Sequence, residues 1–176
     1  MTTIFYDGVD LHADTRVVTS TIPARIRDGA TKLFTSQNNV FHYGIAGRMP
    51  RDDHRLNDLE PLWFKMLYAF SLVGESIRYE ELRKIGFTIE KITWLQECDA
   101  FVVAKCTTVR YGAEHISVTG GTPSVMGSGG YFLLGAHAAG RSIADCFKIT
   151  NRLDNLTSAT FETLRVDTLN DLVIGG

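Results

Sequence analysis

The second residue of the chain, Thr2, offers chemistry that needs no extended motif. If Met1 is removed, the Thr2 hydroxyl can act as a nucleophile and its own α-amine as the base, because a free α-amine has a pKa of about 7.7–8.0. Such a site also needs a cation beside the amine, a carboxylate to hold that cation, and backbone N–H donors for an oxyanion. It further needs an N-terminus held in a strand, which the alternating pattern of residues 3–6 predicts.

Other motifs that carry chemistry are missing from the sequence. It has no P-loop, no dinucleotide-binding glycine pattern, no H-E-x-x-H and no G-x-S-x-G. The five histidines are scattered and the three cysteines show no C-x-x-C spacing, so we expect solvated or hydrogen-bonded histidines and reduced thiols. We therefore expect no metal site and no cofactor.

Length and charge are those of an ordinary globular protein. The 176 residues are 44% apolar, and 20 acidic against 18 basic side chains leave a net charge of −2. We expect one domain over residues 1–176, and this charge favours neither a nucleic-acid nor a membrane partner. Residues 1–16 carry three aspartates instead of a basic and apolar leader, which together with reduced cysteines predicts a cytoplasmic protein.

The first quarter of the chain is predicted to be β-structure. Asp7-Gly8 and Asn38-Asn39 each lie between apolar-polar alternating runs, a pattern typical of hairpins. The sequence predicts strands at residues 3–6, 9–13, 15–21, 24–27, 32–35 and 40–45. Together they predict a β-meander over residues 3–46.

The remainder alternates between groups of helices and strands. Helical spacing runs from residue 56 to 70, with a break or kink expected at Pro61, and residues 76–85 predict a short helix closed by Gly86. We then expect strands at 100–105, 107–111 and 115–119, helices at 131–139 and 143–156, a strand at 160–166 and a loose end. Segregated runs of this kind predict an α+β fold with two stacked antiparallel sheets between helix layers.

Short segments spread along most of the chain match one known pattern in order. They are Thr2-Thr3-Ile4, Ala13-Asp14-Thr15-Arg16, Thr31-Lys32-Leu33, Ile45-Ala46-Gly47, Gly127-Ser128-Gly129-Gly130 and Asp154-x-x-Thr157. This order resembles the proteasome β-subunits and the bacterial proteasome-like peptidase HslV, which are N-terminal-threonine (Ntn) hydrolases. The resemblance implies their four-layer αββα sandwich.

The resemblance also implies a role for each matching residue. Thr2 is the expected nucleophile, Lys32 the cation, Asp14 the carboxylate that fixes Lys32, and Gly47 the donor of the oxyanion N–H. A carboxylate beside the lysine suits this role because charge-assisted hydrogen bonds fix an ammonium group.

Five more positions follow from the same resemblance. Ser128 is expected to bond the N-terminal amine, and Asp154 and Thr157 to support the network around it. Ile45 and Met49 are expected to line an apolar pocket for the substrate residue before the scissile bond. Thr157 stands where the family usually has serine, so the hydroxyl is kept.

Every one of these positions also has an ordinary structural explanation. With Met1 retained, Thr2 is simply a first-strand residue, and Asp14 only ends a strand. Four further alternatives stay open: Arg25, Arg27 or Lys91 as the cation, Gly47 as a turn glycine, Ser128 as the cap of a helix near Gly130, and Asp154 with Thr157 as a helix-end pair.

The function implied by the resemblance is a threonine peptidase that cleaves a polypeptide substrate inside a homo-oligomeric ring. An ATP-dependent unfoldase partner is implied as well, although the chain itself carries no ATP-binding motif. Two alternatives remain. One is a catalytically inactive ring or scaffold protein that keeps Met1, and the other is a hydrolase of a small-molecule amide on the same fold.

Overall fold

The Asp7-Gly8 pair folds the start of the chain into a hairpin, as predicted. Strands β1 (Ile4–Tyr6) and β2 (Asp10–Asp14) pair antiparallel with Ile4 opposite Ala13. Gly8 has a φ of 100°, and Asp7 Oδ1 accepts hydrogen bonds from the N–H groups of Val9 and Asp10 at 2.8 and 2.7 Å. A side-chain oxygen that satisfies the turn in this way fixes the register of the two strands.

The computed structural model describes most of the chain. The described residues are 2–18, 25–47, 60, 61, 63, 79–105, 107–111, 116–119 and 121–171. Met1, Met49 and nearly all of the helix predicted between residues 56 and 70 lie outside these ranges, as does the end of the strand predicted at 15–21.

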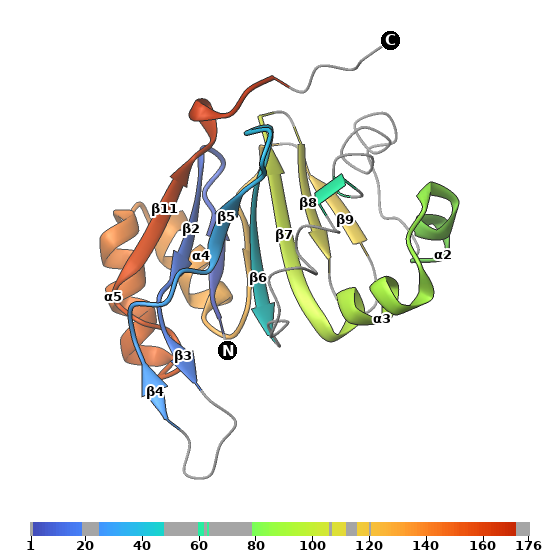
Figure 1. Cartoon of the computed structure of the whole chain (residues 1–176). Helices are drawn as coiled ribbons and strands as arrows, with labels where there is room; N and C mark the ends of the chain where they lie inside the picture. Colours follow the sequence, from blue (N-terminus) through green and yellow to red (C-terminus); the bar gives the residue numbers. More distant parts are fainter. Residues whose placement is uncertain are drawn as a thin grey trace.

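Two antiparallel sheets form the centre of the molecule (Figure 1). The four-stranded sheet has the order β10 (Ser124–Met126), β1, β2, β11 (Phe161–Arg165). The five-stranded sheet runs in chain order: β5 (Leu33–Thr35), β6 (His42–Gly47), β7 (Cys98–Ala104), β8 (Thr107–Tyr111) and β9 (Ile116–Thr119).

The predicted β-meander over residues 3–46 is wrong. After Asp14 the chain leaves the first sheet, forms a separate two-stranded ribbon from β3 (Val17–Val18) and β4 (Ile26–Arg27), and enters the second sheet at β5. The partner on the other side of β2 is β11, from the end of the chain. Turn residues specify which neighbouring strands pair, but they do not specify which sheet each hairpin joins.

The two sheets pack face to face through an apolar core. Both sheets contribute to it, and the segment after β11 adds two further residues. Its members are Ile4, Tyr6, Leu11, Ala13, Leu33, Ala46, Phe101, Val103, Met126, Val166 and Leu169. Helices α4 (Gly130–Ala138) and α5 (Ile143–Leu153) cover the outer face of the four-stranded sheet through Phe5, Val125, Leu133, Cys146 and Phe147.

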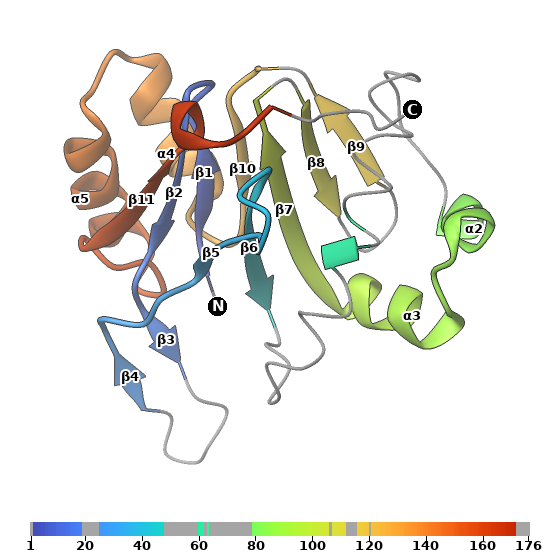
Figure 2. The ribbon, with the colours of Figure 1, turned by 45° about the horizontal axis from the view of Figure 1, so that its top comes forward.

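Two further helices complete the layers. Helices α2 (Tyr79–Leu82), followed by the 3₁₀ turn η1 (Arg83–Ile85), and α3 (Ile89–Glu97) lie on the other side of the molecule (Figure 2). The result is the predicted four-layer αββα sandwich. No helix within the described ranges has the length and apolar character needed to cross a membrane.

Several predicted boundaries need correction. The sequence did not predict β10, which has only three residues beside a glycine-rich segment, or helix α3. Helix α5 ends at Leu153, not residue 156, because the Asp154 carboxylate accepts a hydrogen bond from Leu156 N–H at 3.0 Å and turns the chain. The predicted loose end instead begins with a 3₁₀ turn, η2 (Val166–Thr168), followed by Leu169, which is only 2% exposed.

Candidate active site

The Asp14 carboxylate, fully buried at the end of β2, is the centre of a polar cluster that includes Thr3, Arg16, Lys32 and Ser158. Its Oδ1 accepts hydrogen bonds from Thr3 N–H at 2.7 Å and from the Lys32 ammonium at 2.9 Å. Its Oδ2 accepts from the backbone N–H groups of Arg16 and Ser158 at 2.9 and 3.2 Å. A buried charge is tolerated only when it is paired and hydrogen-bonded, and four donors meet that condition here.

Two hydrogen-bond acceptors hold the Lys32 ammonium in place. The side chain is 4% exposed, and its ammonium donates to Asp14 and to the Arg16 carbonyl oxygen. Burial lowers the pKa of Lys32, while the charge and hydrogen bond of Asp14 act in the opposite direction. The chain therefore holds a desolvated lysine in one position, directly before β5.

Thr2 lies one peptide unit away from this ion pair. It is 7% exposed and precedes β1, and the N–H of its neighbour Thr3 donates to the same oxygen of Asp14 that accepts from Lys32. Gly127, with a φ of 90°, packs its backbone on Thr2, where a Cβ would overlap the Thr2 carbonyl oxygen. Glycine is required at this position for both reasons.

A chain of hydroxyl groups runs from Thr3 to Asp154. Thr157 Oγ1 donates to Asp154 Oδ2 at 2.7 Å, so its single proton is used, and Thr3 Oγ1 must donate to Thr157 across 2.6 Å. Thr3 Oγ1 in turn accepts from Gly129 N–H at 3.1 Å. Aligned donors of this kind polarise one another and rigidify the segment that carries Thr2.

Ser128 and Asp154 meet at the other end of this chain. Ser128 Oγ donates to Asp154 Oδ2 at 2.7 Å. Partial burial would raise the pKa of Asp154, but hydrogen bonds from Thr157, Ser128 and Leu156 N–H outweigh it and hold that pKa below its usual value. The alternative of Ser128 as a helix cap is wrong, because α4 is capped by Gly129 without a side-chain hydrogen bond.

The remaining predicted residues lie around β6. Gly47 is the last residue of this strand and pairs with Cys98, and Ile45 is fully buried and pairs with Ala100. Met49 lies outside the described residues. The oxyanion role of Gly47 and the pocket role of Ile45 and Met49 remain predictions.

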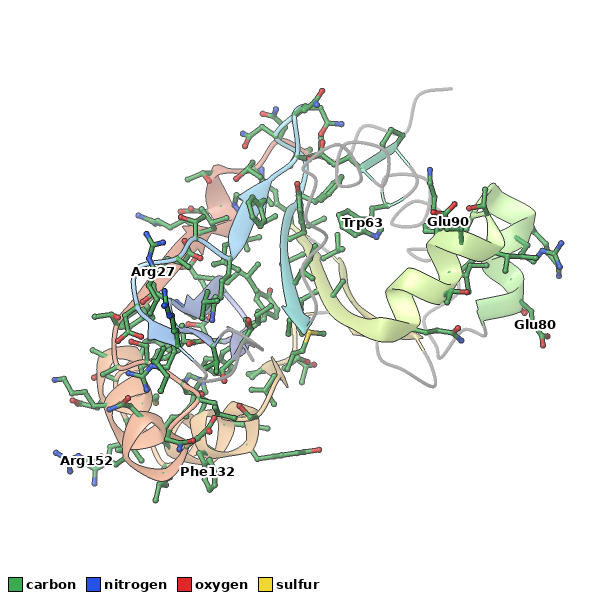
Figure 3. The ribbon with its side chains drawn as sticks, turned by 60° about the horizontal axis from the view of Figure 1, so that its bottom comes forward. Arg27, Trp63, Glu80, Glu90, Phe132 and Arg152 are labelled. Carbon is green, nitrogen blue, oxygen red and sulfur yellow. The ribbon has the colours of Figure 1, made fainter. Side chains whose placement is uncertain are left out.

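Of the four candidate cations, Lys32 is the one held against Asp14. Arg25 and Arg27 are exposed, the latter on the β3–β4 ribbon (Figure 3), and Lys91 belongs to α3. In the described part of the chain, His, Cys, Asp and Glu side chains nowhere gather in groups of three or more that could hold a metal ion.

Arg16 is a part of the cluster whose side-chain role the sequence did not reveal. Its Nη1 donates to the carbonyl oxygens of Asn155 and Thr157 at 2.8 and 3.2 Å, and its Nε and Nη2 donate to the Asp28 carboxylate at 2.9 and 3.1 Å. It therefore links the turn after α5 to the segment before Lys32. In the sequence, only its position two residues after Asp14 pointed to a place near the candidate site.

Comparison with known proteins gives a match at the level of the fold. No family model and no curated protein matches the chain. Among solved structures, eukaryotic HslV from Trypanosoma brucei superimposes with a TM-score of 0.65 at 17% identity, over 92% of this chain and 97% of that one. Thiobacillus denitrificans BPH gives a TM-score of 0.57 at 12% identity over 99% of both chains.

The same BPH in complex with epoxomicin gives a TM-score of 0.55 at 10% identity, over 93% of this chain and 96% of that one. These identities are too low to carry an activity across, but the similarity covers almost the whole length of each protein. Together with the helix–sheet–sheet–helix layers, it shows that this chain has the fold of HslV and the proteasome β-subunits.

Proposed function

We propose that the chain is a threonine peptidase whose nucleophile is the Thr2 hydroxyl, exposed as the N-terminal residue by removal of Met1. The observation that carries this proposal is that Asp14 Oδ1 accepts hydrogen bonds from both Thr3 N–H and the Lys32 ammonium. One buried oxygen thus keeps a cation close to the peptide unit that follows the nucleophile. The fold of HslV supports the same assignment.

In the proposed reaction, the Thr2 hydroxyl attacks the scissile carbonyl carbon while its proton passes to the Thr2 α-amine. The Gly47 N–H stabilises the resulting oxyanion. The C–N bond then breaks, the proton moves to the leaving amine, and an ester between Thr2 and the substrate remains. Water hydrolyses this ester and restores the hydroxyl.

The neighbouring charges set the state of the α-amine in this scheme. The Lys32 cation lowers the pKa of a free amine beside it, so that more of the amine is a base at neutral pH. Asp14 keeps the cation in place. Ser128, Asp154 and Thr157 orient the segment around the amine through their shared hydrogen bonds.

The assembly proposed with this activity is a homo-oligomeric ring in the cytoplasm. Ile45 and Met49 would line an apolar substrate pocket within it. The fold shared with HslV supports this assembly and, more weakly, an ATP-dependent unfoldase that delivers polypeptide substrates.

Hydrolysis assays on casein and on short fluorogenic peptides test the proposal. We expect the processed wild-type protein and a Thr168→Ala control, altered at an exposed threonine of η2, to cleave them. Thr2→Ala should be inactive. Cleavage that survives in Thr2→Ala would contradict the proposal, and activity on small amides alone would favour the small-molecule alternative.

A further inference from the structure

Glu162 connects the two sheets at a point directly beside the proposed site. It lies on β11, the edge strand of the four-stranded sheet (Figure 1). This strand contacts β5, the edge strand of the five-stranded sheet. Glu162 Oε1 accepts hydrogen bonds from the backbone N–H groups of two consecutive residues, Lys32 and Leu33, the second at 2.9 Å. The side chain is half-buried.

This contact fixes the backbone from which the lysine extends. An edge strand leaves donors unpaired on its open side, and buried N–H groups there need an acceptor. Asp14 holds the tip of the Lys32 side chain, and Glu162 holds its main chain. With both ends fixed, the position of the ammonium depends on two carboxylates from two different strands.

We propose that Glu162 is a positioning residue for Lys32, holding the start of β5 so that the ammonium reaches Asp14 beside Thr2. This inference rests on the proposed function, because it assigns Glu162 an effect on the reactivity of Thr2. It also makes a structural claim about two backbone N–H groups that is independent of any activity.

The charge of Glu162 adds a second effect. Three carboxylates face Lys32 and raise its pKa against the effect of burial: Asp14 from β2, Glu162 from β11 and Asp28 from the segment before β5. Arg16 contributes a carbonyl oxygen to the ammonium, and its guanidinium is paired with Asp28. Loss of the Glu162 charge should therefore lower the pKa of Lys32 further.

Two substitutions separate the two effects. Glu162→Gln keeps an oxygen for the two N–H groups and removes the charge, whereas Glu162→Ala removes both. Glu80→Gln is the matched control, because it makes the same change of charge at an exposed residue of α2, on the far side of the molecule (Figure 3). The measurement uses epoxomicin, a peptide epoxyketone, as an electrophile directed at the N-terminal threonine, and follows the rate at which it modifies each protein as a function of pH.

We expect Glu162→Ala to react about 10- to 100-fold more slowly at its optimum, since small displacements of a positioning group have effects of this size. Glu162→Gln should stay within about threefold of wild type at its optimum, with the alkaline limb of its profile moved to lower pH, because the pKa of Lys32 falls when the Glu162 charge is lost. Glu80→Gln should match wild type. If both Glu162 variants behave like Glu80→Gln, the inference is wrong.

Hydrogen exchange distinguishes this inference from the proposed function. The amides of Lys32 and Leu33 should exchange faster in Glu162→Ala than in wild type and Glu162→Gln, whether or not Thr2 reacts. Unchanged exchange would overturn the positioning role, whereas a wild-type protein that does not react with epoxomicin would count against the proposed function alone. If Glu162→Ala fails to fold, the pH profile of Glu162→Gln decides.

Discussion

Two residues of β2, His12 and Asp14, each form an ion pair that is largely shielded from solvent, yet the two pairs differ in what surrounds them. His12 contacts Asp7 at 3.2 Å, and Asp14 contacts Lys32 at 2.9 Å. The His12 and Asp7 side chains are 5% and 16% exposed, and those of Lys32 and Asp14 are 4% and 0% exposed. Burial and pairing alone therefore do not distinguish them.

All the contacts of the His12 pair lie within the four-stranded sheet and its first turn. Asp7 belongs to the turn that joins β1 and β2, and His12 also contacts Thr163 Oγ1 at 2.8 Å. The rings of Phe5 and Phe161 lie 6.1 and 6.2 Å from the imidazole. This pair holds a hairpin and its neighbouring strand together under the helices.

The pair formed by Lys32 is assembled from segments far apart in the sequence. Backbone donors from Thr3, Arg16 and Ser158 converge on Asp14, and the cation comes from the start of β5 in the other sheet. Its neighbour is the N-terminal segment that carries Thr2. A buried ion pair therefore supports a catalytic assignment only where it also fixes a charge beside a candidate nucleophile, as this one does beside Thr2.

The largest effect is expected from Lys32→Met. Removing the cation leaves an uncompensated buried carboxylate, which costs about 3–5 kcal/mol of the free energy of unfolding. Reactivity toward epoxomicin should fall by about 10²–10³-fold or more. Urea unfolding and labelling rates measure the two losses.

A second variant makes this test sharper. Adding Asp14→Asn to Lys32→Met should recover part of the lost stability, because the buried charge is gone, but none of the reactivity. Recovery of the reactivity would show that the ion pair serves only the fold, as the pair of His12 does.

An intermediate effect is expected from Gly127→Ala, which places a Cβ where the Thr2 carbonyl oxygen lies. Gly121→Ala is the matched control: Gly121 also has a positive φ, of 61°, but its Cβ would meet nothing within 4 Å. We expect Gly127→Ala to lose about 100-fold in labelling rate through displacement of Thr2, and Gly121→Ala to keep the wild-type rate. Equal rates in the two variants would mean that the close contact between Gly127 and Thr2 does not affect the reactivity of Thr2.

The smallest effect on reactivity is expected from His12→Leu. Loss of its contacts with Asp7 and Thr163 should lower the free energy of unfolding by about 1–3 kcal/mol. The labelling rate of the folded protein should stay within about twofold of wild type. A large loss of labelling in a variant that stays folded would show that the His12 pair, like the Lys32 pair, affects the reactivity of Thr2.

The sequence predicted the parts of the fold that local signals specify. The hairpin at Asp7-Gly8 and the helix after Gly130 are confirmed by β1, β2 and α4. The distribution of strands between the two sheets was not predictable, because it depends on long-range pairings such as β2 with β11. The three residues of β10 were too few to form a recognisable pattern.

The candidate site likewise contains residues that the sequence could predict and one that it could not. Asp14 and Lys32 stood out through their place in segments that resemble a known family, and the structure brings them together. Glu162 had no such signal, since in an alternating strand it looks like any solvent-facing acid. Its contact with the N–H groups of Lys32 and Leu33 follows only from the meeting of two sheet edges.

The most direct test of the central claim is the intact mass of the purified protein before and after incubation with epoxomicin, with the modified residue located by fragmentation. We predict a chain that begins at Thr2 and gains one epoxomicin adduct on that residue. A chain that keeps Met1, or an adduct on a residue other than Thr2, would contradict the claim that Thr2 is the nucleophile.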